Sequence, residues 1–123
     1  MNHLRLAVLF ATAALLPACF PEYDCTEEYR PAVQITVVDT QGRRQPDARV
    51  TYVRGDEPER PAECIPVTVG TGCDQWVAGP DEPGSFVITA RSADGTRTVK
   101  QSVEVSGDLC HANTELVRLT LPD

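Results

Sequence analysis

From Pro31 onward the chain consists of short runs in which apolar and polar residues alternate, separated by turn-forming residues. In the run 32–38, for example, Val33, Ile35 and Val37 fall on one face, which is typical of a strand that covers a hydrophobic core. The runs that we predict as strands are 32–38, 48–54, 65–69, 75–78, 85–91, 98–105 and 114–121. No segment outside the first 18 residues shows a helical period. This pattern predicts an all-β domain of seven strands folded as a β-sandwich, in which two sheets cover each other's apolar faces.

The amino-terminal segment has the composition of an export signal. Arg5 and the amino terminus provide positive charge before the apolar stretch 6–16. As a helix this stretch would be about 16 Å long, roughly half the thickness of a bilayer core, which is too short to span a membrane and typical of a signal peptide. An ordinary secretory signal that is cleaved nearby would have the same composition.

Residues 16–19, Leu-Pro-Ala-Cys, resemble the lipobox of bacterial lipoproteins. The resemblance implies that residues 1–18 are a signal peptide, that Cys19 receives a diacylglycerol group and a fatty acid such as palmitate, and that residues 19–30 form a lipidated tether. Phe20 stands where inner-membrane lipoproteins of enteric bacteria have Asp, so we expect an anchor in the outer membrane of a bacterial cell envelope. Two or three acyl chains would hold the protein at that membrane permanently.

The charge of the chain excludes some classes of partner. The sequence has 11 Lys and Arg against 18 Asp and Glu, or −7, and removal of Arg5 with the signal peptide gives 10 against 18, or −8. A chain this acidic is a poor ligand for nucleic acid or for anionic lipid headgroups. We therefore expect contact with the membrane through the lipid on Cys19, and an envelope protein or glycan as the other partner.

Four cysteines remain when Cys19 is set aside, namely Cys25, Cys64, Cys73 and Cys110. An even number of cysteines in a small exported domain predicts two disulfides, for which three pairings are open. A zinc site would need closely spaced ligand pairs, whereas here the nearest cysteines are nine residues apart and His111 is the only histidine of the mature chain. We therefore predict disulfides and no metal site.

The first two predicted strands and the turn between them resemble the opening of carboxypeptidase-regulatory-like domains. The segment 33–42 reads V-x-I-x-V-V-D-x-x-G and is followed by Pro-Asp-Ala-Arg-Val at 46–50, and 84–88 supplies a later G-x-F-x-I strand. The resemblance spans 31–122. It implies that the domain 31–123 is a seven-stranded, Ig-like sandwich of the transthyretin-like type.

In transthyretin-like sandwiches the first and penultimate strands lie side by side and parallel. If the runs that start at Ala32 and Thr114 form that pair, Cys25 and Cys110 enter the sheet at the same end. The resemblance therefore implies a disulfide between Cys25 and Cys110, which leaves Cys64 and Cys73 to close a short loop.

The sequence contains no catalytic motif. His111 lies directly beside Cys110, so we interpret it as a loop residue at a strand entrance and not as a general base. Hydroxyisourate hydrolases share the transthyretin fold but depend on several histidines and a characteristic C-terminal tetrapeptide, whereas this chain ends in Leu-Thr-Leu-Pro-Asp. We therefore expect a non-enzymatic protein without a cofactor.

Acidic loops and a single tryptophan leave two binding functions open. We interpret the loop carboxylates as solvated surface, with calcium coordination as the alternative. They are Asp56, Glu57, Glu59, Glu63, Asp74, Asp81 and Glu82. Trp76, the only tryptophan, is expected to pack near a disulfide in the core, with contact to a stacked sugar ligand as the alternative.

Together these features predict a lipid-anchored cell-envelope protein that acts as a structural or protein-binding module, with a glycan- or calcium-binding module as the alternative. A bridge from Cys25 would leave about six residues, or little more than 20 Å, between the lipid and the domain. By strand polarity, we expect the loop 55–63 to face the membrane and the loops 39–44 and 93–97 to face a partner.

Overall fold

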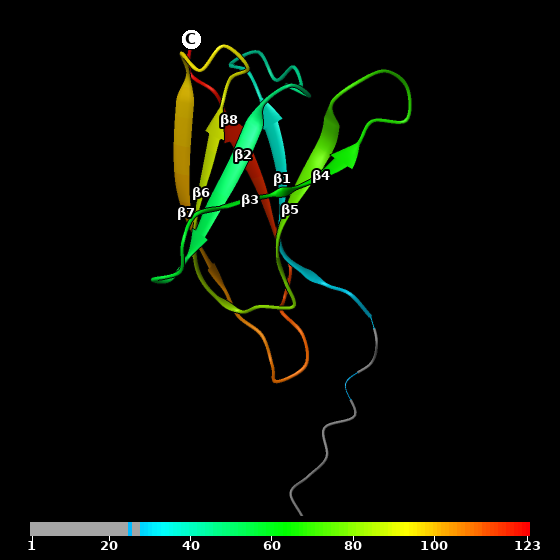
Figure 1. The fold of residues 1–123 in the computed structure, drawn as a ribbon, viewed down its shortest axis with the longest axis vertical. Helices are drawn as coiled ribbons and strands as arrows, with labels where there is room; N and C mark the ends of the chain where they lie inside the picture. The colour runs from blue at the N-terminus through cyan, green and yellow to red at the C-terminus, as the bar shows by residue number, and fades with distance from the viewer. Residues whose placement is uncertain (1–24, 26–27) are drawn as a thin grey trace, which may run out of the picture.

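The computed structural model describes residue 25 and residues 28–123, so the predicted signal peptide 1–18 and Cys19 lie outside the described residues. Within this range the chain is all-β and forms two four-stranded sheets (Figure 1). The strands are β1 (Pro31–Val38), β2 (Arg49–Arg54), β3 (Arg60–Pro61), β4 (Glu63–Pro66), β5 (Cys73–Pro80), β6 (Gly84–Arg91), β7 (Thr98–Val105) and β8 (Glu115–Thr120). One sheet has the order β4-β5-β1-β8 and the other β3-β2-β6-β7. The predicted β-sandwich is confirmed, whereas the predicted count of seven strands is wrong, since the described residues form eight. The described part of the chain has no helix that is long and apolar enough to cross a membrane.

The difference in strand count arises between β2 and β5. The prediction of a strand at 65–69 is wrong in its bounds, because β4 ends at Pro66 and a loop follows. Gly70 and Gly72 in this loop have φ angles of +97° and +103°, in a region that strands do not use. The hairpin between β4 and β5 therefore turns earlier than the apolar run suggests.

β3 lies where the chain passes from one sheet to the other. It pairs with Thr51 and Tyr52 of β2, and the Arg60 guanidinium lies 5.0 Å from the centroid of the Tyr52 ring, in a cation–π contact. The Ala62 N–H then donates to the Val50 carbonyl at 2.9 Å before β4 begins in the other sheet. An Arg-Pro pair has no apolar alternation, so this strand leaves no signal in the sequence pattern.

β1 is an inner strand of its sheet and carries much of the core. It pairs with β5 in antiparallel and with β8 in parallel orientation, so Ile35 lies opposite both Trp76 and Val117. Val33, Ile35 and Val37 are all buried, as the alternating pattern predicts. The parallel pairing expected between the runs that start at Ala32 and Thr114 is present as β1 and β8, although β8 is here the last strand and not the penultimate one.

The core between the sheets contains side chains from both layers. The largest fully buried side chains include Phe86, Ile35 and Ile88, and the rings of Tyr52 and Phe86 lie 5.9 Å apart. A Cβ atom on Gly79, whose φ is +65°, would come within 2.7 Å of the Phe86 ring. Only glycine therefore allows β5 to approach Phe86 so closely.

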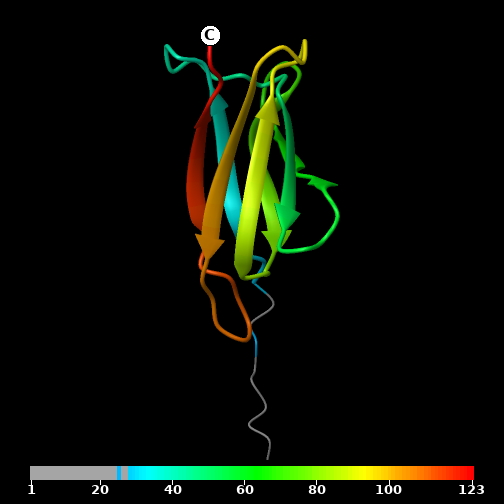
Figure 2. The ribbon, with the colours of Figure 1, turned by 90° about the vertical axis from the view of Figure 1, so that its left-hand side faces the viewer.

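The loops gather at opposite ends of the sandwich (Figures 1 and 2). At the end where β1 begins, which we call the tether end, lie residues 28–30 and the loops 55–59, 81–83 and 106–114. At the other, which we call the far end, lie the loops 39–48, 67–72 and 92–97 and the carboxyl terminus. This grouping agrees with the strand polarity expected from the sequence.

Candidate functional site

Two disulfides tie the domain together in the pairs that the resemblance implies. Cys25 is bonded to Cys110 across a sequence separation of 85, with 5.1 Å between their Cα atoms. Cys64 is bonded to Cys73 across a separation of 9. The first bond joins the segment before β1 to the loop before β8, and the second closes the β4–β5 hairpin. The long bridge therefore fixes the start of the domain to the tether end.

His111 lies beside this bridge and is mostly buried, with 11% of its side chain exposed. Its Nδ1 is 3.1 Å from Oδ1 of Asp81, and the same oxygen accepts the Arg30 N–H at 3.1 Å. Asp108 accepts the N–H groups of His111 and Cys110 at 2.8 Å each, and these two bonds, that of His111 first, lower the pKa of Asp108. These contacts hold the loop before β8 against the entry to β1.

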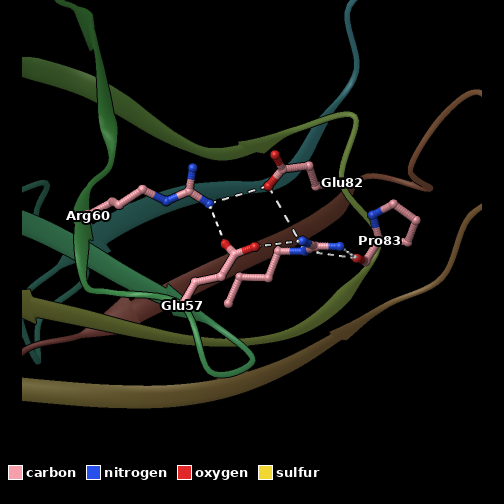
Figure 3. A network of polar contacts seen from close by, with 5 residues as sticks. Glu57, Arg60, Glu82 and Pro83 are labelled. Carbon is pink, nitrogen blue, oxygen red and sulfur yellow. Dashed lines mark hydrogen bonds and ion pairs between the residues drawn. The ribbon is translucent and has the colours of Figure 1, made fainter.

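Two arginines and two glutamates form a network at the same end (Figure 3). Glu57 accepts hydrogen bonds from Arg54 at 3.1 Å and from Arg60 at 2.9 Å. Glu82 accepts one from Arg60 at 3.3 Å and lies 4.0 Å from Arg54, which also donates to the Pro83 carbonyl. Because each carboxylate is shared between two guanidinium groups, the network closes the loop 55–59 onto the loop before β6.

The other carboxylates considered for calcium do not converge. Glu59 lies 3.9 Å from Arg91, and Asp74 forms an ion pair with Arg44. Among residue 25 and residues 28–123, no group of three or more His, Cys, Asp or Glu side chains could hold a metal ion. These side chains therefore give the calcium alternative no support in the described part of the chain.

Trp76 is a core residue and is only 3% exposed. It lies in β5 opposite Ile35 of β1 and Cys64 of β4. Alternation along β5 turns its side chain toward the second sheet, so the ring offers no face on which a sugar could stack. This burial contradicts the alternative of a ligand contact through the Trp76 ring.

Two aspartates shape the loops of the far end. Asp39 accepts the backbone N–H and the Nε of Arg43 at 2.9 Å each, and the backbone bond is the main reason that the pKa of Asp39 is lowered. Asp94 accepts the Ser92 hydroxyl at 2.5 Å and the Thr96 N–H at 3.1 Å, and these bonds lower the pKa of Asp94 to about 2. Both carboxylates bond within their own loops and stay ionised at neutral pH.

A shallow concavity of about 270 Å³ lies on the outer face of the β4-β5-β1-β8 sheet, near the far end. Its floor contains Gln34, Thr36 and Val38, which alternate with the buried core residues of β1 and so lie on the opposite face. β8 contributes Leu116, which is 77% exposed. The surface thus places amide and hydroxyl groups beside an exposed leucine.

Two arginines line this concavity, and no carboxylate is among its lining residues. Arg44, from the loop after β1, donates to the Asp74 carbonyl at 3.3 Å and forms an ion pair with the Asp74 carboxylate. Arg118 of β8 lies against Gly42, where a Cβ atom would come within 3.3 Å of its Nη2. In the described part of the chain Arg118 forms no ion pair. One guanidinium is therefore neutralised locally and the other is not.

Sequence reasoning predicts the inward residues of β8 correctly but does not identify this surface. Val117, Leu119 and Leu121 are expected to point inward, and all three are buried. The same alternation places Leu116 and Arg118 on the outward face. The apolar residue Leu116 at an outward position of β8 is the sequence feature that could have indicated a binding surface here.

The candidate site is thus the concavity with the adjoining loop 39–44. Comparisons with protein-family models, with curated proteins and with solved structures find no match to this chain.

Proposed function

We propose that this chain is a non-enzymatic protein of the bacterial cell envelope, anchored in the outer membrane through lipid at Cys19, and that its domain binds another protein. The observation that carries the proposal is the disulfide between Cys25 and Cys110. It attaches the chain to the tether end within six residues of Cys19, which leaves a free reach of about 20 Å. The tether end would then face the lipid, and the far end would face outward from it.

Three further observations support this proposal. Disulfides persist in oxidising compartments and are rare in reducing ones, so the two bonds fit an exported protein. The parallel pairing of β1 with β8 supports a transthyretin-like sandwich of the carboxypeptidase-regulatory-like type. Binding residues are commonly carried on loops that a rigid scaffold positions, and the loop 39–44 borders the concavity. Among residue 25 and residues 28–123, no comparable feature favours a glycan or calcium ligand.

The anchor is tested by Cys19→Ser. We expect this variant to incorporate no labelled fatty acid and to remain as an uncleaved precursor, because the lipid is attached through the cysteine thiol. The double variant Cys64→Ser/Cys73→Ser, which removes thiols elsewhere in the chain, should keep its lipid label. Normal cleavage and membrane retention of Cys19→Ser would contradict the anchor.

Partner binding at the far end is tested by site-specific photo-crosslinking in intact cells. A photoreactive residue at Gln41, which is exposed and adjoins the concavity, is expected to crosslink the chain to an envelope protein. The matched control is Lys100, which is exposed on β7 of the other sheet. Crosslinks of equal yield from Lys100 would indicate binding through the outer face of the β3-β2-β6-β7 sheet and would contradict a site at the far end and the adjoining concavity.

A further inference from the structure

We infer that the concavity on the β4-β5-β1-β8 sheet binds an aspartate or glutamate side chain of the partner protein, together with an apolar residue next to it. The inference deepens the proposed function and rests on it in one respect, namely that the partner is a protein.

Charge is the first argument for this ligand. The whole chain has a net charge of −7, yet two guanidinium groups and no carboxylate line the concavity. Asp74 neutralises Arg44, whereas Arg118 forms no ion pair among the described residues. A carboxylate is the ligand that a guanidinium recognises best, because two parallel N–H donors match its two oxygens.

The neutral lining is the second argument. Gln34, Thr36 and Gln75 supply amide and hydroxyl groups beside the guanidinium, so a carboxylate bound there could accept more than one hydrogen bond. Leu116 is 77% exposed at the edge of this polar group. An apolar residue of the partner would cover it and remove its surface from water.

The size of the concavity is the third argument. A volume of about 270 Å³ lies just below the range of pockets that enclose a drug-sized ligand. A concavity of this volume can hold one or two side chains of a partner protein whose remaining surface lies outside it. Gly42 borders it from the loop 39–44, so a partner seated in it would also lie against the far end.

The experiment is a titration of the purified full chain, in non-ionic detergent, followed by backbone amide shifts in NMR spectra. The probes are acetyl-Leu-Asp-Leu-amide and the isosteric acetyl-Leu-Asn-Leu-amide, which differ only in the charge of the central side chain. We expect the Asp peptide to bind about fivefold more tightly than the Asn peptide, as for an exposed charge-assisted pair. The largest shifts should fall at Thr36, Gly42 and Arg118, and salt should weaken only the Asp peptide.

Three variants test whether Arg118 causes the preference for the Asp peptide and whether Leu116 provides the apolar contact. Arg118→Gln should reduce the preference for Asp to less than about twofold, whereas Arg49→Gln, on the outer face of the other sheet, should keep it. Leu116→Ser should weaken both peptides equally, because it removes only the apolar contact. Acetate is a further probe, and shifts from acetate as large as those from the Asp peptide would assign the site to small anions and overturn the inference.

Two other results would overturn it. One is equal binding of the Asp and Asn peptides, and the other is an unchanged Asp preference in Arg118→Gln. Neither result bears on lipid labelling at Cys19 or on crosslinking from Gln41. The failure of this inference is therefore distinguishable from the failure of the proposed function.

Discussion

Replacement of both Cys25 and Cys110 by serine is expected to lower the free energy of unfolding by about 4–5 kcal/mol. The bridge spans a sequence separation of 85 and so closes a loop that contains nearly the whole described domain. In the unfolded chain it removes many of the conformations that would otherwise be available, and the stabilisation grows with the length of the closed loop. Small domains are typically stable by about 5–15 kcal/mol, so this bridge would supply a large share.

The matched control is the double variant Cys64→Ser/Cys73→Ser. Its loop spans a separation of only 9, so the expected loss is about 2–3 kcal/mol. Both variants keep an even number of cysteines in the domain and introduce two serines, which leaves loop length as the main difference. Urea unfolding followed by circular dichroism measures both losses. A larger loss from the short bridge would show that strain or local packing, and not chain entropy, decides the stabilisation.

The strands β1, β6 and β7 could be predicted from the sequence because each places apolar residues at alternating positions toward the core, such as Phe86, Ile88 and Ala90 of β6. β7 occupies 98–105 as predicted, and β1 and β6 begin one residue before the predicted runs. At these positions burial follows the alternation of the sequence, so a local pattern contains the information, although β1 also buries Ala32 and Val38 and β6 also buries Thr89.

The region between β2 and β5 could not be predicted in the same way. All four residues of β4 are exposed, so there is no buried face to produce an alternation. β3 contains two residues, and its position depends on the passage of the chain from one sheet to the other. β3 and β4 pair with β2 and β5 because of the order of the strands in the two sheets, and this order is not contained in the composition of residues 60–66.

The same limit applies to the candidate site. The concavity combines outward residues of β1, β5 and β8 with the loop 39–44, and these segments are far apart in the sequence. Arg118 adjoins Gly42 only because β8 pairs with β1 in parallel and in one particular register. The alternation of the sequence places Arg118 on an outward face, but the lack of a carboxylate among the residues that line the concavity with it depends on the folded arrangement.

The replacement Trp76→Ala is expected to lower the free energy of unfolding by about 3–5 kcal/mol, as for other large aromatic residues removed from a core. Trp76 is 3% exposed and lies opposite Ile35, so its loss would leave a cavity between the sheets beside the β4–β5 hairpin. The control is Leu116→Ala in the same sheet, which removes an apolar side chain that is 77% exposed and should change stability by less than about 0.5 kcal/mol. Circular dichroism during urea unfolding suits both variants, because it does not depend on the tryptophan that one of them lacks. A surface platform for sugar would make the two replacements equally mild, so equal midpoints would contradict the assignment of Trp76 to the core.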